Sequence, residues 1–200
     1  MYNSSVDFVV KSIQKSPLVN LNGLIYQEYQ DFLDDFLLNK IVNEYKMFEF
    51  DKLENQGYKP RAKLSYQSKL SKELNIFFSN VKIKNSLEKI YNTELKFSSC
   101  DVWQDGQAYF LHPHTDDRSI KLALQIYLGE NVAEGTKFFS QFVSNIAEVE
   151  VWKEDYSKYE VKEINYKKNC GYSLLNNQQS WHGVAPNNID NRLSLYVRYS

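Results

Sequence analysis

The chain has 200 residues, 42% of them apolar and 15% aromatic, which is enough to build one domain around a single core and argues against wholesale disorder. Its 24 basic and 25 acidic residues give a formal charge of −1, and this balance disfavours a nucleic-acid partner, because duplex-binding proteins concentrate positive charge. Two cysteines form no disulfide framework, and no segment is long and apolar enough to cross a membrane, so we expect a reduced, cytoplasmic protein with no membrane partner.

The first 93 residues, approximately, are expected to form a mainly helical layer. The strongest pattern lies in Asp31–Lys46, where apolar residues recur every three or four positions and predict one apolar stripe along a helix. Weaker patterns of the same kind predict helices over Val6–Lys15, Ser71–Phe78 and Asn85–Tyr91. An outer strand is expected at Tyr58–Tyr66.

From about residue 94 to residue 200, apolar residues alternate with polar ones, as in half-buried strands. The expected strands are Leu95–Trp103, Ile120–Leu128, Thr136–Phe142, Glu148–Trp152, Tyr159–Ile164, Tyr172–Asn176 and Leu193–Tyr199. Turn-forming pairs such as Asp105-Gly106 separate them. Short strands behind a helical segment predict an α+β protein in which residues 1–200 form a single domain with a β-sandwich or rolled-barrel core.

A short motif in the second half has the composition of a metal site. His114 and Asp116 lie two residues apart, so in extended backbone both side chains project to the same face, and His182 follows 68 residues after His114. Two imidazoles and one carboxylate on one face of a six-coordinate ion leave three positions open, which suits non-haem Fe(II). A closed zinc site would need a fourth ligand. His112 offers a second register, in which His112 and His114 are the paired ligands.

An arginine follows the last histidine at a suggestive distance. Arg192 comes ten residues after His182, an offset that in a β-helix puts it on the neighbouring strand, pointing into the same barrel. Its guanidinium can hold the far carboxylate of 2-oxoglutarate through two hydrogen bonds, whereas a buried arginine without an anion would be costly. Ser194 lies on the same face by the two-residue period and can donate another hydrogen bond.

On these residues the chain resembles the Fe(II)- and 2-oxoglutarate-dependent dioxygenases, most closely the prolyl 4-hydroxylase-like branch. The resemblance covers approximately Asp101 to Ser200. It is carried by Trp103-x-x-Gly106, Pro113-His114-Thr115-Asp116, Leu124-Gln125-Ile126-Tyr127-Leu128, Glu134-Gly135-Thr136-Lys137-Phe138, Gly171, His182-Gly183-Val184 and Arg192-x-Ser194.

The resemblance implies a double-stranded β-helix (jelly-roll) core behind the N-terminal helical layer, with dioxygen as oxidant and ascorbate as a supporting reductant. The metal ligands would be His114, Asp116 and His182. The residues that bind 2-oxoglutarate would be Arg192, helped by Ser194 and Tyr127. The residues of the substrate pocket would be Trp103 and Tyr109.

The resemblance further implies hydroxylation of an unactivated C–H bond in a prolyl or other amino-acid residue or in a small metabolite, so the partner would be a small molecule or a peptide. Arg192 and Arg198 are six residues apart, a spacing also found in the AlkB-type nucleic-acid demethylases. An AlkB-type oxidative demethylase of nucleic acid is therefore the alternative enzyme, and Arg198 is a further pocket candidate. Arg198 could instead pair with Asp116 or Asp117. The alternative outside enzymology is a cupin-like binding protein that retained the barrel without turnover.

Overall fold

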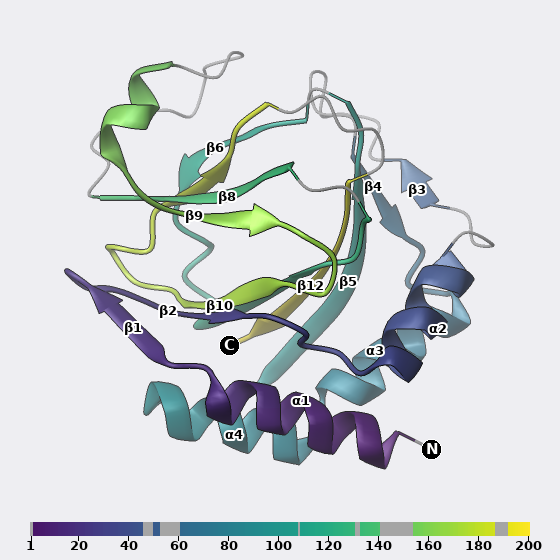
Figure 1. Ribbon diagram of the computed structural model, residues 1–200. Helices are drawn as coiled ribbons and strands as arrows, with labels where there is room; N and C mark the ends of the chain where they lie inside the picture. Colours follow the sequence, from purple (N-terminus) through teal and green to yellow (C-terminus); the bar gives the residue numbers. More distant parts are fainter. Residues whose placement is uncertain are drawn as a thin grey trace.

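The chain folds into two antiparallel β-sheets with a layer of helices outside the larger one (Figure 1). The structure, a computed structural model, describes residues 2–45, 50–52, 61–107, 109–130, 133–140, 154–186 and 192–200. The helices are α1 (Asn3–Lys15), α2 (Asp35–Tyr45), α3 (Lys69–Phe78), α4 (Val81–Tyr91) and the 3₁₀ helix η1 (Glu154–Tyr159). No helix in the described ranges has the length and apolar character needed to span a membrane.

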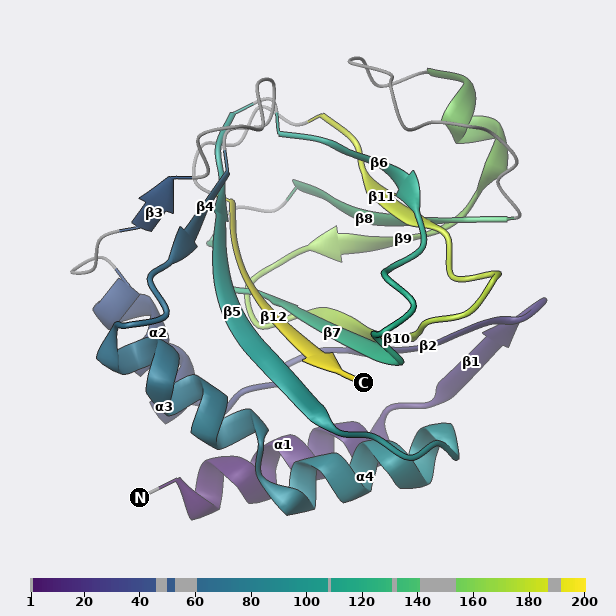
Figure 2. The ribbon, with the colours of Figure 1, turned by 180° about the vertical axis from the view of Figure 1, so that it is seen from behind.

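The larger sheet has eight strands in the order β1-β2-β10-β7-β12-β5-β4-β3, and the smaller sheet has four in the order β6-β11-β8-β9. Four strands come from the N-terminal part of the chain that also contains α1 to α4: β1 (Leu18–Leu21), β2 (Leu24–Tyr29), β3 (Phe50–Lys52) and β4 (Arg61–Leu64). The remaining strands are β5 (Phe97–Asp105), β6 (Leu111–His114), β7 (Leu122–Tyr127), β8 (Ala133–Phe139), β9 (Glu160–Tyr166), β10 (Gly171–Leu175), β11 (His182–Val184) and β12 (Arg192–Tyr199). The two sheets face each other across the interior, which confirms the predicted double-stranded β-helix (Figures 1 and 2).

Strand β12 shows how the sequence period assigns its side chains to two environments. Its odd-numbered residues, from Leu193 to Tyr199, are buried in the apolar cluster that also contains the inner faces of α1 to α4. Since neighbouring residues of a strand point to opposite faces, the even-numbered residues face the space between the sheets. They are Arg192, Ser194, Tyr196 and Arg198. The helical layer therefore covers one face of the larger sheet and leaves the polar face for the interior.

The N-terminal half contains more strand than its sequence pattern indicated. The hairpin β1–β2 was not predicted, and it pairs with β10 so that Gly171 lies opposite Tyr29. Its turn is Asn22-Gly23, with φ values of 54° and 93°, the left-handed backbone that favours these residues. The first 93 residues thus supply four of the eight strands of the larger sheet as well as the helices.

The predicted helices are all present, with shifted ends. The helix expected over Asp31–Lys46 begins at Asp35, and Lys46 lies outside the described residues. Residues 31–34 form a loop instead, because Asp31 has a φ of 50° and the backbone of Leu33 bonds to the side chain of Asn169 in both directions, at 2.8 Å each. Phe32 is nevertheless fully buried, so its apolar character reflects packing rather than a helical turn.

Most strands predicted in the second half are present, and β4 overlaps the outer strand expected at Tyr58–Tyr66. The strand expected at Glu148–Trp152 lies outside the described residues. Strand β6 was not predicted, and for β11 the sequence indicated no more than a strand that begins at His182. The two strands have four and three residues and are too short to show alternation. These two short strands carry both candidate histidine ligands.

Candidate active site

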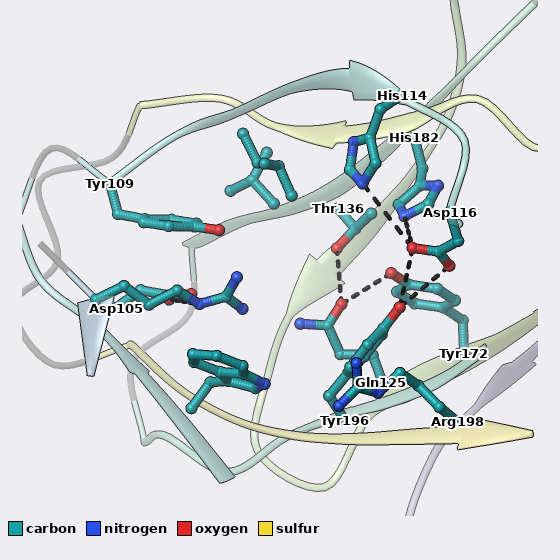
Figure 3. A pocket seen from close by; sticks show the side chains of 14 residues that line it. Asp105, Tyr109, His114, Asp116, Gln125, Thr136, Tyr172, His182, Tyr196 and Arg198 are labelled. Atoms are coloured by element: carbon teal, nitrogen blue, oxygen red, sulfur yellow. Dashed lines mark hydrogen bonds and ion pairs between the residues drawn. The ribbon is translucent and has the colours of Figure 1, made fainter. Parts of the chain in front are cut away.

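His114, Asp116 and His182 form a cluster at one end of the smaller sheet (Figure 3). His114 is the last residue of β6 and His182 the first of β11, and the two are paired across the strands, with ring centroids 4.4 Å apart. Oδ1 of Asp116 lies 4.0 Å from Nε2 of His114 and 3.9 Å from Nε2 of His182. One ligand atom from each residue falls within 4.8 Å of the others, so one ion could contact all three.

A glycine permits the close approach of the two histidine strands. A Cβ at Gly183 would lie 2.6 Å from the carbonyl oxygen of Leu111, closer than side-chain carbons come to backbone in proteins. Any larger residue at position 183 would push β11 away from β6. The segment His182-Gly183-Val184 therefore contains both a candidate metal ligand, His182, and the glycine that lets its strand approach β6.

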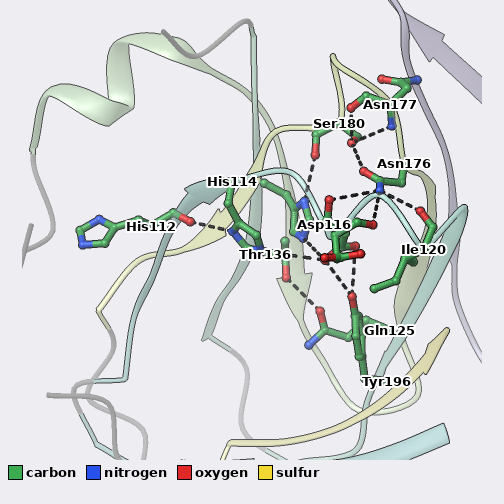
Figure 4. Close-up of polar contacts among 12 residues, drawn as sticks. His112, His114, Asp116, Ile120, Gln125, Thr136, Asn176, Asn177, Ser180 and Tyr196 are labelled. Atoms are coloured by element: carbon green, nitrogen blue, oxygen red, sulfur yellow. Dashed lines mark hydrogen bonds and ion pairs between the residues drawn. The ribbon is translucent and has the colours of Figure 1, made fainter. Parts of the chain in front are cut away.

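Backbone acceptors set the orientation of both imidazoles. Nδ1 of His114 lies 2.8 Å from the carbonyl oxygen of His112, and Nδ1 of His182 lies 2.9 Å from that of Ser180 (Figure 4). Because a carbonyl oxygen can only accept, each Nδ1 carries a proton, and the ring nitrogen that faces Asp116 is Nε2 in both residues. Metal-binding histidines use this arrangement, in which Nδ1–H bonds to a supporting acceptor such as a backbone carbonyl.

The loop that carries Asp116 is held by Asn176. The side-chain Nδ2 of Asn176 donates to the carbonyl oxygens of Asp116, Asp117 and Ile120 at 3.2, 3.0 and 2.8 Å. Its Oδ1 accepts from Ser180 Oγ at 3.0 Å, so one amide ties the Asp116 loop to the segment that precedes His182 (Figure 4). This support makes the cluster a property of packed backbone rather than of free side chains.

Tyr196 on β12 reaches across from the larger sheet to the carboxylate. Its hydroxyl donates to both oxygens of Asp116, at 3.0 and 3.1 Å. Burial, reinforced by the Asp116 charge, raises the pKa of Tyr196 well above its usual value, so the phenol keeps its proton and acts as a donor. The sequence analysis missed Tyr196, although the two-residue period that linked Arg192 to Ser194 continues to it.

The cluster opens into a cavity of about 270 Å³ between the sheets. One wall is a hydrogen-bonded polar group: Oε1 of Gln125 accepts from Tyr172 at 2.8 Å, and Nε2 of Gln125 donates to Ser194 at 3.3 Å. Behind it, the hydroxyl of Tyr127 donates to Thr136 Oγ1 at 2.8 Å. Tyr127 and Ser194 are thus buried members of the polar network, while Gln125 and Tyr172, which the sequence analysis missed, line the cavity itself.

Trp103 and Tyr109 line the cavity, as the sequence analysis expected. The guanidinium of Arg61 lies between them, with its carbon 4.0 Å from the Trp103 ring centre and 5.1 Å from that of Tyr109. Nε of Arg61 is 2.9 Å from Oδ1 of Asp105, which is almost completely buried. Burial raises the pKa of Asp105, and the charges of Arg61 and Arg192 oppose that rise.

Arg192 is the largest fully buried side chain in the described part of the protein, with 1% of its surface exposed. None of its three guanidinium nitrogens makes a hydrogen bond to a described residue. Its charge rests instead against two aromatic rings, at 5.3 Å from Tyr127 and 5.1 Å from Tyr166. The expectation that Arg192 lies on the strand beside His182 was wrong. Strand β12 pairs with β5 and β7 in the larger sheet, whereas β11 belongs to the smaller sheet, so Arg192 and His182 lie on opposite sides of the interior.

Arg198 and His112, two further candidate site residues, contact other partners than the sequence analysis expected. Arg198 lines the cavity but pairs with neither Asp116 nor Asp117; its Nη2 lies 2.5 Å from Asp101 Oδ2 and its Nε donates to Ser99 at 2.9 Å. The ring of His112 points away from the cluster (Figure 4). Its Nδ1 lies 3.2 Å from the hydroxyl of Tyr156. The second ligand register, with His112 and His114, is therefore not assembled.

Comparison of the sequence with protein-family models and with curated proteins gave no match. Comparison of the fold gave many. A prolyl 4-hydroxylase from Pseudomonas putida is similar with a TM-score of 0.60 and 13% identity over 97% of both chains. A Trichoplax adhaerens prolyl hydroxylase, solved with a peptide of hypoxia-inducible factor, has a TM-score of 0.61 and 12% identity over 97% of this chain and 88% of its own.

A third similar structure was solved with a different kind of molecule. The epimerase SnoN, solved with Fe³⁺, α-ketoglutarate and nogalamycin RO, has a TM-score of 0.62 and 12% identity over 98% of this chain and 83% of its own. The chain thus has the double-stranded β-helix fold of the 2-oxoglutarate- and Fe(II)-dependent oxygenases. Within that fold it contains a His-Asp-His cluster of the kind that can hold a metal ion.

Proposed function

We propose that the protein is an Fe(II)- and 2-oxoglutarate-dependent oxygenase in which His114, Asp116 and His182 hold the metal. The observation that carries the proposal is the convergence of these three donors, with both imidazoles oriented so that Nε2 faces Asp116. Two nitrogens and one carboxylate oxygen match the preference of non-haem Fe(II). Thiolates take no part, because Cys100 and Cys170 are buried elsewhere in the core.

The buried guanidinium of Arg192 supports 2-oxoglutarate as the cosubstrate. A cation that is 1% exposed and makes no hydrogen bond to a described residue is costly until an anion joins it. A carboxylate suits the planar fork of arginine, and the second carboxylate of the same molecule would reach toward the metal. Tyr127, beside the guanidinium, and Ser194, on the same face of β12, would help to bind the far end.

The remaining residues of the cavity would orient the reactants. When bound, iron and 2-oxoglutarate supply the oxidising chemistry that removes hydrogen from a C–H bond, with dioxygen as oxidant and ascorbate as a supporting reductant. Tyr196 keeps the Asp116 carboxylate in place, and Trp103 and Tyr109 provide an apolar wall that excludes water from the reacting carbon.

The substrate class that we propose is an amino-acid or prolyl residue, or a small metabolite of similar size. A cavity of about 270 Å³ suits one such group beside 2-oxoglutarate. The similar structures include enzymes solved with a peptide and with a small natural product, so the fold accepts both kinds. The arginine spacing that resembles nucleic-acid demethylases has a structural explanation here, because Arg198 is bound to Asp101 and Ser99.

An anaerobic titration tests the proposal. We expect the protein to bind Fe(II) and then, on addition of 2-oxoglutarate, to develop a weak visible charge-transfer band. Asp116→Ala should abolish iron binding. Arg192→Gln should bind iron normally but need about 10- to 100-fold more 2-oxoglutarate for the band, since a hydrogen-bonded charge pair contributes about 1.5–3 kcal/mol.

The matched control is Lys82→Gln, which removes one positive charge from an exposed ion pair with Asp7 on the helical layer. It should titrate as the wild type does. A wild-type protein that binds iron without any spectral response to 2-oxoglutarate would support a cupin-like binding protein instead. Iron binding by Asp116→Ala at wild-type affinity would refute the ligand assignment.

A further inference from the structure

The inner face of β4, β5 and β12 carries more positive than negative charge. Four cations and two carboxylates lie on this inner face, and three of the six, Arg61, Asp105 and Arg198, line the cavity. They are Arg61, Lys63, Arg192 and Arg198 against Asp101 and Asp105. Register places them in two groups, because Arg61 and Arg192 both lie opposite Asp105 on either side of it. The other two cations share Asp101, so each carboxylate has one cation too many beside it.

The surplus at Asp101 lies at the cavity. Oδ1 of Asp101 is 2.8 Å from Nζ of Lys63, and its Oδ2 is 2.5 Å from Nη2 of Arg198, so both of its oxygens are already engaged. Arg198 lines the cavity with about a third of its side chain exposed, and its contacts with Ser99 and Asp101 use Nε and Nη2, on one edge of the guanidinium. A donor edge of Arg198 therefore remains for a ligand.

The cavity joins this edge to the candidate metal cluster. Arg198 lies 5.8 Å from the ring of Tyr196, whose hydroxyl bonds to Asp116, and both Arg198 and the three cluster residues line the same space (Figure 3). Between the two cation groups, on the same inner face, Trp103 gives the cavity an apolar surface. A molecule in the cavity can thus present carbon to the cluster and an anionic group to Arg198.

The net charge of the site with Fe(II) and 2-oxoglutarate bound indicates which charge the substrate carries. This step rests on the proposed function. Fe(II) adds two positive charges, Asp116 removes one, and 2-oxoglutarate brings two negative charges, of which one would meet Arg192. With the four cations and two carboxylates of the wall, one positive charge remains uncompensated, at the Lys63–Asp101–Arg198 group.

We propose that the substrate carries a carboxylate, which binds at Arg198 and Lys63 while the carbon to be oxidised lies at the metal. Carboxylate is favoured because the free edge of a guanidinium offers parallel N–H donors to its two oxygens. The group would belong to a free carboxylic acid or to an acidic end of a peptide, and acids of both kinds share this chemistry.

Matched acids and amides test the proposal without knowledge of the natural substrate. The protein is loaded with Zn(II) in place of iron and with saturating 2-oxoglutarate, and binding is measured by ligand-observed NMR. The probes are N-acetyl-L-proline against N-acetyl-L-prolinamide, and benzoate against benzamide. We expect each acid to bind at least about tenfold more tightly than its amide, and Arg198→Gln to abolish that preference, whereas Lys82→Gln should retain it.

A second variant should change the affinity for acids in the opposite direction. Asp101→Asn releases Lys63 and Arg198 from their shared carboxylate at nearly constant volume, so acids should bind several-fold more tightly than to the wild type. A purely structural role of the group would weaken binding in both variants. Three results would overturn the proposal: acids and amides bind equally, no acid binding is detected up to about 10 mM, or a folded Asp101→Asn binds acids more weakly than the wild type. Absence of 2-oxoglutarate binding in the wild type would instead refute the proposed function.

Discussion

The hydroxyl of Tyr196 joins the two sheets at the candidate metal cluster. It comes from β12 in the larger sheet and donates to both oxygens of Asp116, which follows β6 in the smaller one. This hydrogen bonding holds the Asp116 carboxylate in one orientation before a metal ion binds. Partners of this kind behind metal ligands contribute to affinity although they never contact the metal.

Tyr196→Phe is therefore expected to weaken metal binding by about 10- to 100-fold, the range seen when such supporting hydrogen bonds are removed. Competition with a chelator of known affinity, using Ni(II) in place of iron, measures the change. The control is Tyr66→Phe, which removes a hydroxyl from an exposed ring outside the cavity. Unchanged affinity in Tyr196→Phe would mean that Asn176 alone holds the Asp116 loop.

At the scale of the elements, Glu73 of α3 connects three helices of the outer layer. It accepts a hydrogen bond from the hydroxyl of Tyr2 at 2.7 Å, just before α1, and lies 3.1 Å from Nζ of Lys40 on α2. The Tyr2 hydrogen bond and the nearby lysines lower the pKa of Glu73, against an opposing effect of burial. Glu73 is thus bound less tightly by a proton in the folded protein than in the unfolded chain.

The sign of its pH dependence follows from that difference. Because the folded pKa lies below the unfolded value near 4.5, the stabilisation is present above about pH 4.5 and is lost as the pH falls through the folded pKa. Glu73→Gln should reduce the fall in unfolding free energy between about pH 5 and pH 3, measured by urea denaturation. Glu94→Gln, which removes a carboxylate without these partners, should keep the wild-type slope; a slope unchanged in Glu73→Gln would contradict the assignment.

The sequence allowed long, strongly patterned elements to be predicted and missed those that depend on their neighbours. Helix α2 and strand β12 show clear periods over 11 and 8 residues. Strand β11 has three residues and exists because Gly183 lets β6 approach, a condition that no period reports. The hairpin β1–β2 is a different case: its Asn22-Gly23 turn is a legible signal that the sequence analysis overlooked.

The candidate site was predictable to the same extent. The spacing of His114 and Asp116 placed two donors on one face, and the spacing of His182 and Arg192 along the chain added two further candidates, to which the resemblance gave roles. The partners of Arg198 could not be deduced, because Asp101 meets it through pairing between strands that are far apart in the sequence. Gln125 and Tyr172 likewise become cavity residues only when the larger sheet curves around the interior.

For the whole molecule, the candidate cluster and Arg192 lie on different sheets, so a bound metal and 2-oxoglutarate would connect them. Ligands that bind only the folded state stabilise it by mass action, by about 2.7 kcal/mol at a concentration 100 times the dissociation constant. We expect Ni(II) with 2-oxoglutarate to raise the unfolding free energy by that order, and EDTA to reverse the gain. Asp116→Ala should show no gain in the same urea titration; a gain equal to that of the wild type would contradict ligand binding at this cluster.

The central position of β12 also affects the order in which the larger sheet can be completed. Its two neighbours, β5 and β7, are made earlier in translation and meet only through residues 192–199. A nascent chain that ends before Arg192 carries two open strand edges, at β5 and at β7, with apolar side chains on one face of each. Open edges of this kind pair readily with other chains, so the interval before β12 emerges from the ribosome exposes this protein to aggregation.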